Sequence, residues 1–299
     1  MIIPAEYALP KYERRSFMDS IRQVKRIVTG HPTADGAGVH LVRVLGRDDV
    51  YDFDPFLMLD AFDSTDPADY IKGFPWHPHR GIETVTYLIS GRIEHGDSLG
   101  NSGVIGDGDC QWMTAGSGII HQEMPKASPR MLGVQLWLNL PAEDKMCAPK
   151  YNGITQAQIP LVREDGTEVR VISGIYRGMA GAAKGDYVQP LYLDVELEPG
   201  ADWQLDTDAE ATLFVYIMAG AGAFGEPGET VAHKHAALFG DGDTFRVTAG
   251  EEGLRFLLLC GQPLGEPIAW GGPIVMNTPE ELRLAFRELD MGTFIKHNA

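Results

Sequence analysis

The sequence predicts an all-β protein built from two tandem antiparallel β-barrels or jelly rolls, with a short C-terminal helix. Apolar residues alternate strictly with other residues in "MLGVQLWLNL" (131–140) and in "LYLDVEL" (191–197), which is the period of two expected of half-buried strands. The 35 glycines and 19 prolines separate such runs as turn residues do. Together these observations favour many short strands over helices.

An internal repeat indicates that the strand pattern occurs twice. The stretch "TVTYLISGRIEH" (84–95) is echoed by "LFVYIMAGAGAF" (213–224), and "GDGDCQWMTAG" (106–116) is echoed by "GDGDTFRVTAG" (240–250). Both halves therefore have the order strand, glycine turn, strand, Gly-Asp-Gly-Asp turn, strand. A unit that is used twice in this way predicts two related antiparallel domains.

The repeat also predicts where the domains begin and end. We expect a first domain, an irregular connection and a second domain at residues 1–140, 141–168 and 169–299. The second domain is expected to end in a helix, because Thr278 can cap it, Pro279 suits its first position and Glu281 completes a capping box.

Charge and composition exclude several classes of function. The formal net charge of −17 repels a phosphate backbone, so we expect no direct binding of nucleic acid. The N-terminal stretch "MIIPAEYALPKYERRS" (1–16) has no long apolar run, and no later stretch is long enough to span a bilayer. We therefore expect a cytoplasmic protein with no membrane association. Cys110, Cys147 and Cys260 lack CxxC spacing, which predicts buried free thiols.

Two pairs of candidate metal ligands have the same spacing. His77 and His79 lie two residues apart, and so do His121 and Glu123. Residues i and i+2 of a strand point to the same face, so each pair aims two side chains into one space. Three imidazoles and one carboxylate would form a mixed nitrogen and oxygen site for a first-row metal, with coordination positions left open. Glu83 is a secondary candidate for the oxygen ligand.

Other histidines are interpreted as having no part in a metal site. His95 follows the first hairpin and is expected to be a partly exposed strand residue. His233 and His235 form a further His-x-His pair, but they precede the Gly-Asp-Gly-Asp turn, where the first half of the chain has no ligand. We therefore expect the second domain to be free of metal and to act as a packing partner for the first.

The stretches that contain these residues resemble the pirin family of the cupin superfamily. They are "DPFLMLD" (54–60), "FPWHPHRGIETVTYLISGRIEHGDSLGN" (74–101), "GDGDCQWMTAGSGIIHQEMP" (106–125), "QLWLNLP" (135–141) and "GPIVMNTPEEL" (272–282), which together reach across almost the whole chain. The resemblance implies a bicupin whose first domain holds one iron through His77, His79, His121 and Glu123. Trp76 stands where the family more usually has an acidic residue, which bears on access to the ligands.

The resemblance implies two alternative functions. Pirins are similar to quercetin 2,3-dioxygenases, which implies a flavonol-like substrate, O2 and one divalent metal, in first place Fe(II), although the ligands also suit Mn, Cu, Ni, Co or Zn. Glu123 would then accept the hydroxyl proton of the substrate. Trp76, Trp112 and Met113 would line its pocket, with packing inside the barrel as the alternative role. The other function is a non-catalytic, iron-containing redox sensor that acts through protein partners. We expect a monomer, because both barrels lie in one chain.

Overall fold

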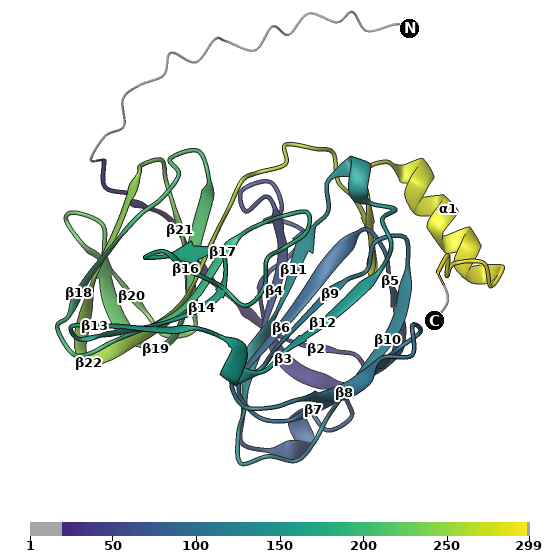
Figure 1. Ribbon diagram of the computed structural model, residues 1–299, viewed down its shortest axis with the longest axis horizontal. Helices are drawn as coiled ribbons and strands as arrows, with labels where there is room; N and C mark the ends of the chain where they lie inside the picture. Colours follow the sequence, from purple (N-terminus) through teal and green to yellow (C-terminus); the bar gives the residue numbers. More distant parts are fainter. Residues whose placement is uncertain (1–19, 298–299) are drawn as a thin grey trace, which may run out of the picture.

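The computed structural model describes residues 20–297, so the expectation for the stretch 1–16 lies outside the described residues. As predicted, strands dominate and form two domains that lie side by side (Figure 1). The strands of the first domain are β2 (His31–Asp35), β3 (Val39–Leu45), β4 (Phe56–Ser64), β5 (Phe74–His79), β6 (Ile82–Ser90), β7 (Ile93–Asp97), β8 (Ser102–Ile105), β9 (Cys110–Thr114), β10 (Ile119–Pro125), β11 (Met131–Asn139) and β12 (Lys150–Ile154). They form a sheet in the order β12-β9-β6-β11-β4-β3-β2 and a four-stranded sheet in the order β5-β10-β7-β8.

The second domain is built on one nine-stranded sheet. Its strands are β1 (Val24–Thr29), β13 (Leu161–Glu164), β14 (Thr167–Ser173), β17 (Leu191–Leu197), β18 (Asp202–Asp206), β19 (Thr212–Phe224), β20 (Glu229–Ala232), β21 (His235–Phe239) and β22 (Thr244–Gly261). The order is β1-β21-β19-β22-β17-β14-β13, with β18 paired to β22 and β20 paired to β19. The long strands β19 and β22 pair through two register shifts, one of them beside Gly220. Gly220 has φ +70°, and a Cβ there would lie 2.1 Å from the carbonyl oxygen of Gly253, so this bend requires glycine.

Short elements complete the fold. They are the hairpins β15 (Ile175–Tyr176) with β16 (Met179–Ala180) and β23 (Ala269–Gly271) with β24 (Ile274–Met276), the 3-10 turns η1 (Pro67–Asp69), η2 (Ala142–Asp144) and η3 (Gln156–Gln158), and the helix α1 (Pro279–Asp290). The predicted capping box is confirmed, because Thr278 accepts from the backbone N–H of Glu281 and the Glu281 carboxylate accepts from that of Thr278. Within residues 20–297, no helix has the length and apolar character needed to span a membrane.

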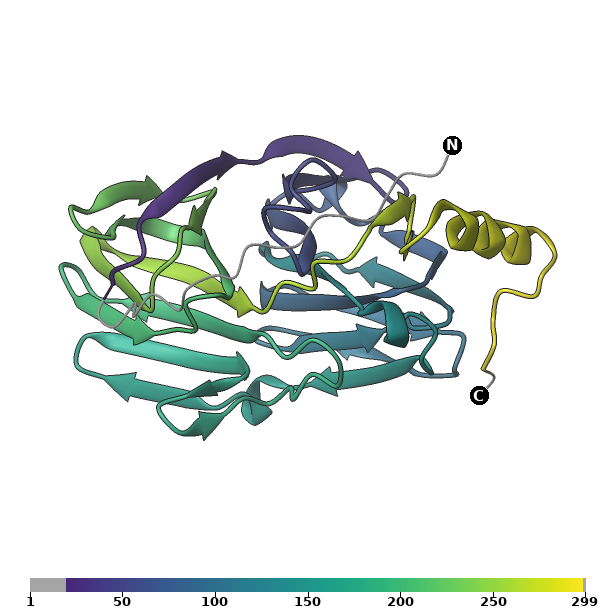
Figure 2. The same cartoon turned by 90° about the horizontal axis from the view of Figure 1, so that it is seen from above.

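Both ends of the chain cross between the domains. β1 pairs with β21 of the second domain, and the chain then passes directly to β2 of the first (Figure 2). At the other end, α1 and the β23–β24 hairpin lie against the first domain, where Ile274 forms a parallel bridge with Arg80. The predicted domain boundaries at residues 140 and 168 remain a prediction. Strand pairing crosses these boundaries at β1 and at β12, and a β-bridge crosses them at the C-terminal segment.

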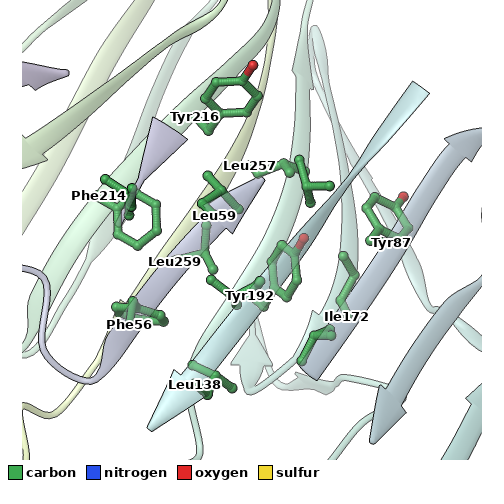
Figure 3. Close-up of a cluster of buried hydrophobic side chains, with 14 of the residues drawn as sticks. Phe56, Leu59, Tyr87, Leu138, Ile172, Tyr192, Phe214, Tyr216, Leu257 and Leu259 are labelled. Atoms are coloured by element: carbon green, nitrogen blue, oxygen red, sulfur yellow. The ribbon is translucent and has the colours of Figure 1, made fainter. Parts of the chain in front are cut away.

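The two domains share a hydrophobic core. Tyr87 and Leu138 of the first domain pack with Tyr192, Phe214 and Leu259 of the second (Figure 3). All five side chains are almost fully buried. Burial of this apolar surface favours association of the two sheets, so the second domain supports the first by packing.

The three cysteines lie largely in packed surroundings. Cys110 and Cys260 are buried and Cys147 is half-buried, and all three are free thiols. The prediction of free thiols is confirmed, and burial is complete for two of the three.

Candidate metal centre

Three histidines from two neighbouring strands converge inside the first domain. β5 and β10 are antiparallel, and their register places His121 opposite His77. One ring nitrogen of each of His77, His79 and His121 lies within 4.8 Å of those of the other two. The i, i+2 spacing thus acts as the sequence predicted, because residues of the same parity on β5 and β10 face the same interior.

Backbone carbonyls set the protonation of two of these rings. His77 Nδ1 lies 2.8 Å from the carbonyl oxygen of Pro75, and His79 Nδ1 lies 3.0 Å from that of Pro273. A carbonyl oxygen can only accept, so each Nδ1 carries the proton and donates. Both Nε2 atoms are then bare acceptors in the neutral ring, and they lie 3.1 Å apart. Two lone pairs that face each other at this distance repel each other unless a cation lies between them.

His121 supplies the third bare ligand. It is buried, and neither ring nitrogen has a hydrogen-bond partner among residues 20–297. Burial lowers the pKa of His121 well below its usual value and that of His79 to about 3, so both rings are neutral, the form that binds metal. Two nitrogen ligands of one ion are expected about 3 Å apart at bond lengths of roughly 2.1 Å, which agrees with the separation of His77 and His79. The three histidines therefore fit a first-row metal ion.

Glu123 lies on the same face of β10 as His121 but is held differently. Thr86 Oγ1 donates to its Oε1 (3.0 Å) and Gln135 Nε2 donates to its Oε2 (2.7 Å). Burial raises the pKa of this carboxyl, and the nearby His77 ring opposes the shift. The compact ligand group contains the three histidines and not Glu123, so its role as fourth ligand stays a proposal.

A cavity of about 860 Å³ opens onto His77 and His79. Trp76, Trp137 and Trp270 contribute aromatic walls beside His77 and His79. The Trp137 ring meets that of His79 edge to face, with centroids 5.0 Å apart. Cavities of this size and lining are typical of sites for small molecules.

Part of the cavity lining is charged. Arg43 donates to both carboxylate oxygens of the buried Asp60, at 2.9 and 2.8 Å, and to Asp35 at 2.8 Å. Asp60 and Asp35 thus neutralise the guanidinium and hold it rigid. The cavity lining thus combines aromatic side chains with the charged group of Arg43, Asp60 and Asp35.

The structure separates the three residues that were predicted to line a pocket. Trp76 lines the cavity and is 54% exposed. Met113 faces the barrel interior and packs with Trp137 in an apolar cluster. Trp112 points to the opposite face of β9, into the core between the domains, and it does not line the cavity beside the histidines. Neighbouring residues of a strand face opposite sides, which is why Trp112 and Met113 are not brought together.

Some residues of the site were missed by sequence reasoning. On β11, Gln135 and Trp137 occupy the positions between the apolar residues of the other face. This alternation indicates that a polar and an aromatic side chain point into the barrel. Pro273 and Trp270 gave no signal, because they come from a distant segment that only the tertiary fold brings to His79.

Buried cationic side chains hold the C-terminal segment that contains Pro273 against the strand that carries His77 and His79. Lys145 Nζ donates to the carbonyl oxygens of Gly81 (2.8 Å) and Val275 (3.1 Å) and to the Asn139 side chain. Arg80 donates to the carbonyl oxygen of Phe294 (2.8 Å). The contact is tight, since a Cβ at Gly81, where φ is +76°, would lie 1.9 Å from the carbonyl oxygen of Val275.

The remaining candidates lie apart from the ligand cluster. His95 is buried rather than partly exposed, because its ring stacks on Tyr151 and the Tyr151 hydroxyl lies 2.7 Å from Nε2. His233 and His235 are in and beside the turn before β21, and the Nδ1 of His235 lies 3.0 Å from the carbonyl oxygen of His233. Glu83 lies on the face of β6 away from the histidines, where Thr114 donates to it at 2.7 Å.

Replacement of Glu83 by glutamine is expected to flatten the pH dependence of stability. Burial raises the pKa of Glu83 from 4.5 to about 7, and the neighbouring donors Thr114 and Trp112 partly oppose this rise. The folded state therefore binds more protons than the unfolded state between these values, and the wild type loses stability as the pH rises from 4.5 to 7. Urea unfolding at pH 5, 6 and 7.5 should show Glu83→Gln gaining up to about 3 kcal/mol relative to the wild type over this interval. Parallel pH profiles of the two proteins would contradict this.

Comparison with known proteins agrees with the fold. The family models for pirin and for the pirin C-terminal cupin domain match residues 38–138 and 192–295. A pirin-like protein of Caulobacter vibrioides is 48% identical over 279 residues, covering 92% of this chain and 99% of its own.

Solved structures show the same architecture. A quercetin 2,3-dioxygenase from Acinetobacter baumannii superposes with a TM-score of 0.83 at 34% identity, covering 92% of this chain and 99% of that one. The bacterial pirin YhhW of Escherichia coli, solved in complex with nickel(II), is 21% identical with a TM-score of 0.62, covers 80% of this chain and 98% of its own, and shows the fold. The chain therefore belongs to the pirin family and is an all-β bicupin.

Proposed function

We propose that this protein is a metal-dependent dioxygenase that opens a flavonol-like aromatic substrate with O2, as a quercetin 2,3-dioxygenase does. The observation that carries the proposal is the group of three converging histidines, two of them neutral, beside a cavity walled by tryptophans. The structural likeness to the Acinetobacter baumannii quercetin 2,3-dioxygenase supports this reaction class.

His77, His79 and His121 would hold the metal, with Glu123 as a candidate fourth ligand. Fe(II) is the first choice, and Mn, Cu, Ni, Co and Zn also suit this donor set. A bound divalent ion would supply Lewis-acid polarisation of a substrate oxygen. The carbonyls of Pro75 and Pro273 support metal binding, because they keep the Nε2 atoms of His77 and His79 free of protons.

Glu123 is proposed as the base that accepts the proton of the substrate hydroxyl. Its burial raises its pKa, and a carboxylate with a raised pKa is a better proton acceptor near neutral pH. Thr86 and Gln135 each donate to one oxygen of Glu123, so the carboxylate is oriented before the substrate arrives.

The aromatic wall is proposed to hold the flat ring system. Trp76 borders His77 and is more than half exposed, so it can close over a ligand in the cavity. Trp137 and Trp270 lie with their ring centroids 5.7 Å apart and form a continuous apolar surface. Stacking on such rings favours a planar aromatic substrate, whose hydroxyl groups would point toward the histidines.

The proposed activity is tested by oxygen uptake and carbon monoxide release from Fe(II)-loaded protein with quercetin. We expect uptake by the wild type and a loss of at least about a hundredfold in kcat for Glu123→Gln, because a general base contributes that much or more. The metal content of each sample is measured before the assay, so that loss of metal and loss of the base are distinguished.

Glu83→Gln is the matched control for this experiment. Glu83 is also a buried glutamate of the first domain, but it faces away from the histidines, so its variant should keep the oxygen uptake of the wild type. Absence of uptake from fully metal-loaded wild type would contradict the dioxygenase proposal and would favour the redox-sensing regulator. The expectations of a monomer, of a cytoplasmic location and of no direct nucleic-acid binding stay predictions.

A further inference from the structure

A row of polar side chains crosses three neighbouring strands beside the histidines. The register places Arg43 of β3 opposite Asp60 of β4, and Asp60 opposite Gln135 of β11. Directly paired residues of neighbouring strands lie on the same face of a sheet, and all three residues line the large cavity. Gln135 Nε2 donates to Glu123 at 2.7 Å. The row therefore begins next to the proposed base and ends at Arg43, two strand spacings or roughly 10 Å from Gln135.

A second carboxylate, that of Asp35, is held beside Arg43 by the turn between β2 and β3. Its Oδ1 accepts from the backbone N–H of Gly36 at 2.7 Å. A Cβ at Gly36, where φ is +58°, would lie 2.6 Å from the carbonyl oxygen of Gly73, so this close approach requires glycine. Gly73 directly precedes β5, the strand of two ligand histidines. The turn thus brings Asp35 to the same end of the cavity as that strand.

One nitrogen of the Arg43 guanidinium remains available to a ligand. Nε and Nη2 donate to Asp60, and Nη2 also donates to Asp35. Within residues 20–297, Nη1 makes no hydrogen bond, and it is not among the unpaired side-chain atoms that are buried. The Arg43 side chain is 26% exposed and lines the cavity. Nη1 therefore offers its N–H groups to a molecule in the cavity, in an orientation fixed by the two carboxylates.

The charge of this group determines which acceptor it suits. Two carboxylates face one guanidinium, so Arg43, Asp60 and Asp35 together carry a net negative charge. An anionic oxygen would be repelled, whereas a neutral carbonyl or hydroxyl oxygen can accept from Nη1. Of the other arginines in the lining, Arg26 is paired with two other aspartates and Arg47 lies over the aromatic wall. Neither of them belongs to this group.

We propose that Arg43 determines the specificity of the site by donating from Nη1 to a neutral oxygen on an outer ring of the substrate. This inference rests on the proposed function, because it takes the reacting hydroxyl of the substrate to lie at the histidines. The roughly 10 Å between Gln135 and Arg43 is comparable to the length of a flavonol, so one molecule reaches both. The substrate class is then a flat, neutral polyphenol with an oxygen substituent remote from the reacting ring.

The test compares the binding of two flavonols by isothermal titration calorimetry, with metal-loaded protein under argon so that no turnover occurs. Quercetin and 3-hydroxyflavone have the same reacting hydroxyl and carbonyl, but 3-hydroxyflavone lacks the hydroxyls of the outer rings. Arg43→Lys keeps a cation beside Asp60 and Asp35 and removes Nη1. We expect this variant to bind quercetin at least about tenfold more weakly than the wild type, and 3-hydroxyflavone within about twofold of it.

The matched control for this experiment is Arg130→Lys. Arg130 is also an arginine of the first domain that is held by an aspartate, Asp63, and it does not line the cavity. This variant should bind both flavonols as the wild type does. An equal loss of affinity for both flavonols in Arg43→Lys, or an unchanged affinity for quercetin, would overturn the proposal.

A second variant keeps the test decisive if Arg43→Lys does not fold. Asp35→Asn retains an acceptor for Arg43 and removes one of the two negative charges. The wild type should bind quercetin that is sulfonated on its outer phenyl ring at least about tenfold more weakly than quercetin. In Asp35→Asn this difference should shrink at least about threefold, because the guanidinium is then balanced by one carboxylate. A difference of the same size in both proteins would overturn the proposal.

The outcomes for Arg43 are distinct from those of the oxygen-uptake assay. Flavonol binding that depends on Arg43, without oxygen uptake, would overturn the dioxygenase and leave the role of Arg43 in place. Oxygen uptake by Arg43→Lys with the wild-type KM for quercetin would overturn the role of Arg43 and leave the dioxygenase in place. A metal-loaded wild type that binds no quercetin would overturn both.

Discussion

Replacement of His121 by alanine is expected to lower the affinity for metal by about a thousandfold while the protein stays folded. A direct ligand contributes more to metal affinity than a residue that hydrogen-bonds to a ligand. Loss of such a hydrogen-bonding residue alone lowers metal affinity roughly ten- to a hundredfold. Neither nitrogen of His121 has a hydrogen-bond partner within residues 20–297, so its removal breaks no hydrogen bond of the fold. Metal content after loading, together with a competition titration against a chelator, measures the change.

The matched control for this experiment is His235→Ala. His235 belongs to the His-x-His pair of the second domain, and its Nδ1 lies 3.0 Å from the carbonyl oxygen of His233. This variant should bind metal as tightly as the wild type. A His121→Ala protein that still holds one metal per chain at wild-type affinity would show that the histidine cluster is not the metal site.

Replacement of Lys145 by methionine is expected to lower the free energy of unfolding by about 4 kcal/mol. Its ammonium donates to two carbonyl oxygens and to Asn139, and a methionine would leave three buried acceptors unpaired at about 1–3 kcal/mol each. Burial lowers the pKa of Lys145 to about 7, although the charges of Glu266 and Glu281 oppose this shift. Three acceptors at one nitrogen favour the ammonium, because a neutral amine has only two N–H groups. Urea unfolding at neutral pH measures the effect.

The same substitution is also expected to weaken metal binding, by roughly tenfold. Lys145 holds Val275 against Gly81, and the carbonyl of the nearby Pro273 accepts from His79. When this segment loosens, His79 loses the partner that keeps its Nε2 free. Lys126→Met is the control, because Lys126 forms an exposed ion pair with Glu94 that contributes less than about 1 kcal/mol. Equal stability of the Lys145 and Lys126 variants would contradict this role of Lys145.

The sequence was sufficient for those features that depend on local periodicity. A strand presents alternate residues to one face, so the spacing of His77 with His79 and of His121 with Glu123 was enough to place each pair on a common face. The same rule separates Trp112 from Met113 and points Gln135 and Trp137 inward. Capping of the last helix was also local, because Thr278 and Glu281 are three residues apart.

Features that join distant segments were not encoded by any local pattern. The pairing of β1 with β21 and the docking of Pro273 on His79 bring together residues nearly 200 or more positions apart. Such contacts depend on which surfaces bury the most apolar area when the whole chain packs, and periodicity does not specify the partner. His95 was misjudged for this reason, since its burial comes from Tyr151 on β12.

The sequence by itself determined the two-domain all-β architecture, the family and the set of candidate ligands, because strand parity, glycine turns and repeated motifs act over a few residues. Only the tertiary structure decided how these ligands are protonated and oriented. The protonation of His77 and His79 follows from carbonyl oxygens placed by the fold. The Tyr151 hydroxyl of β12 lies 2.7 Å from Nε2 of His95 on β7, so this contact also comes from a distant segment. Both depend on hydrogen-bond geometry between segments, which only packing of the whole chain creates.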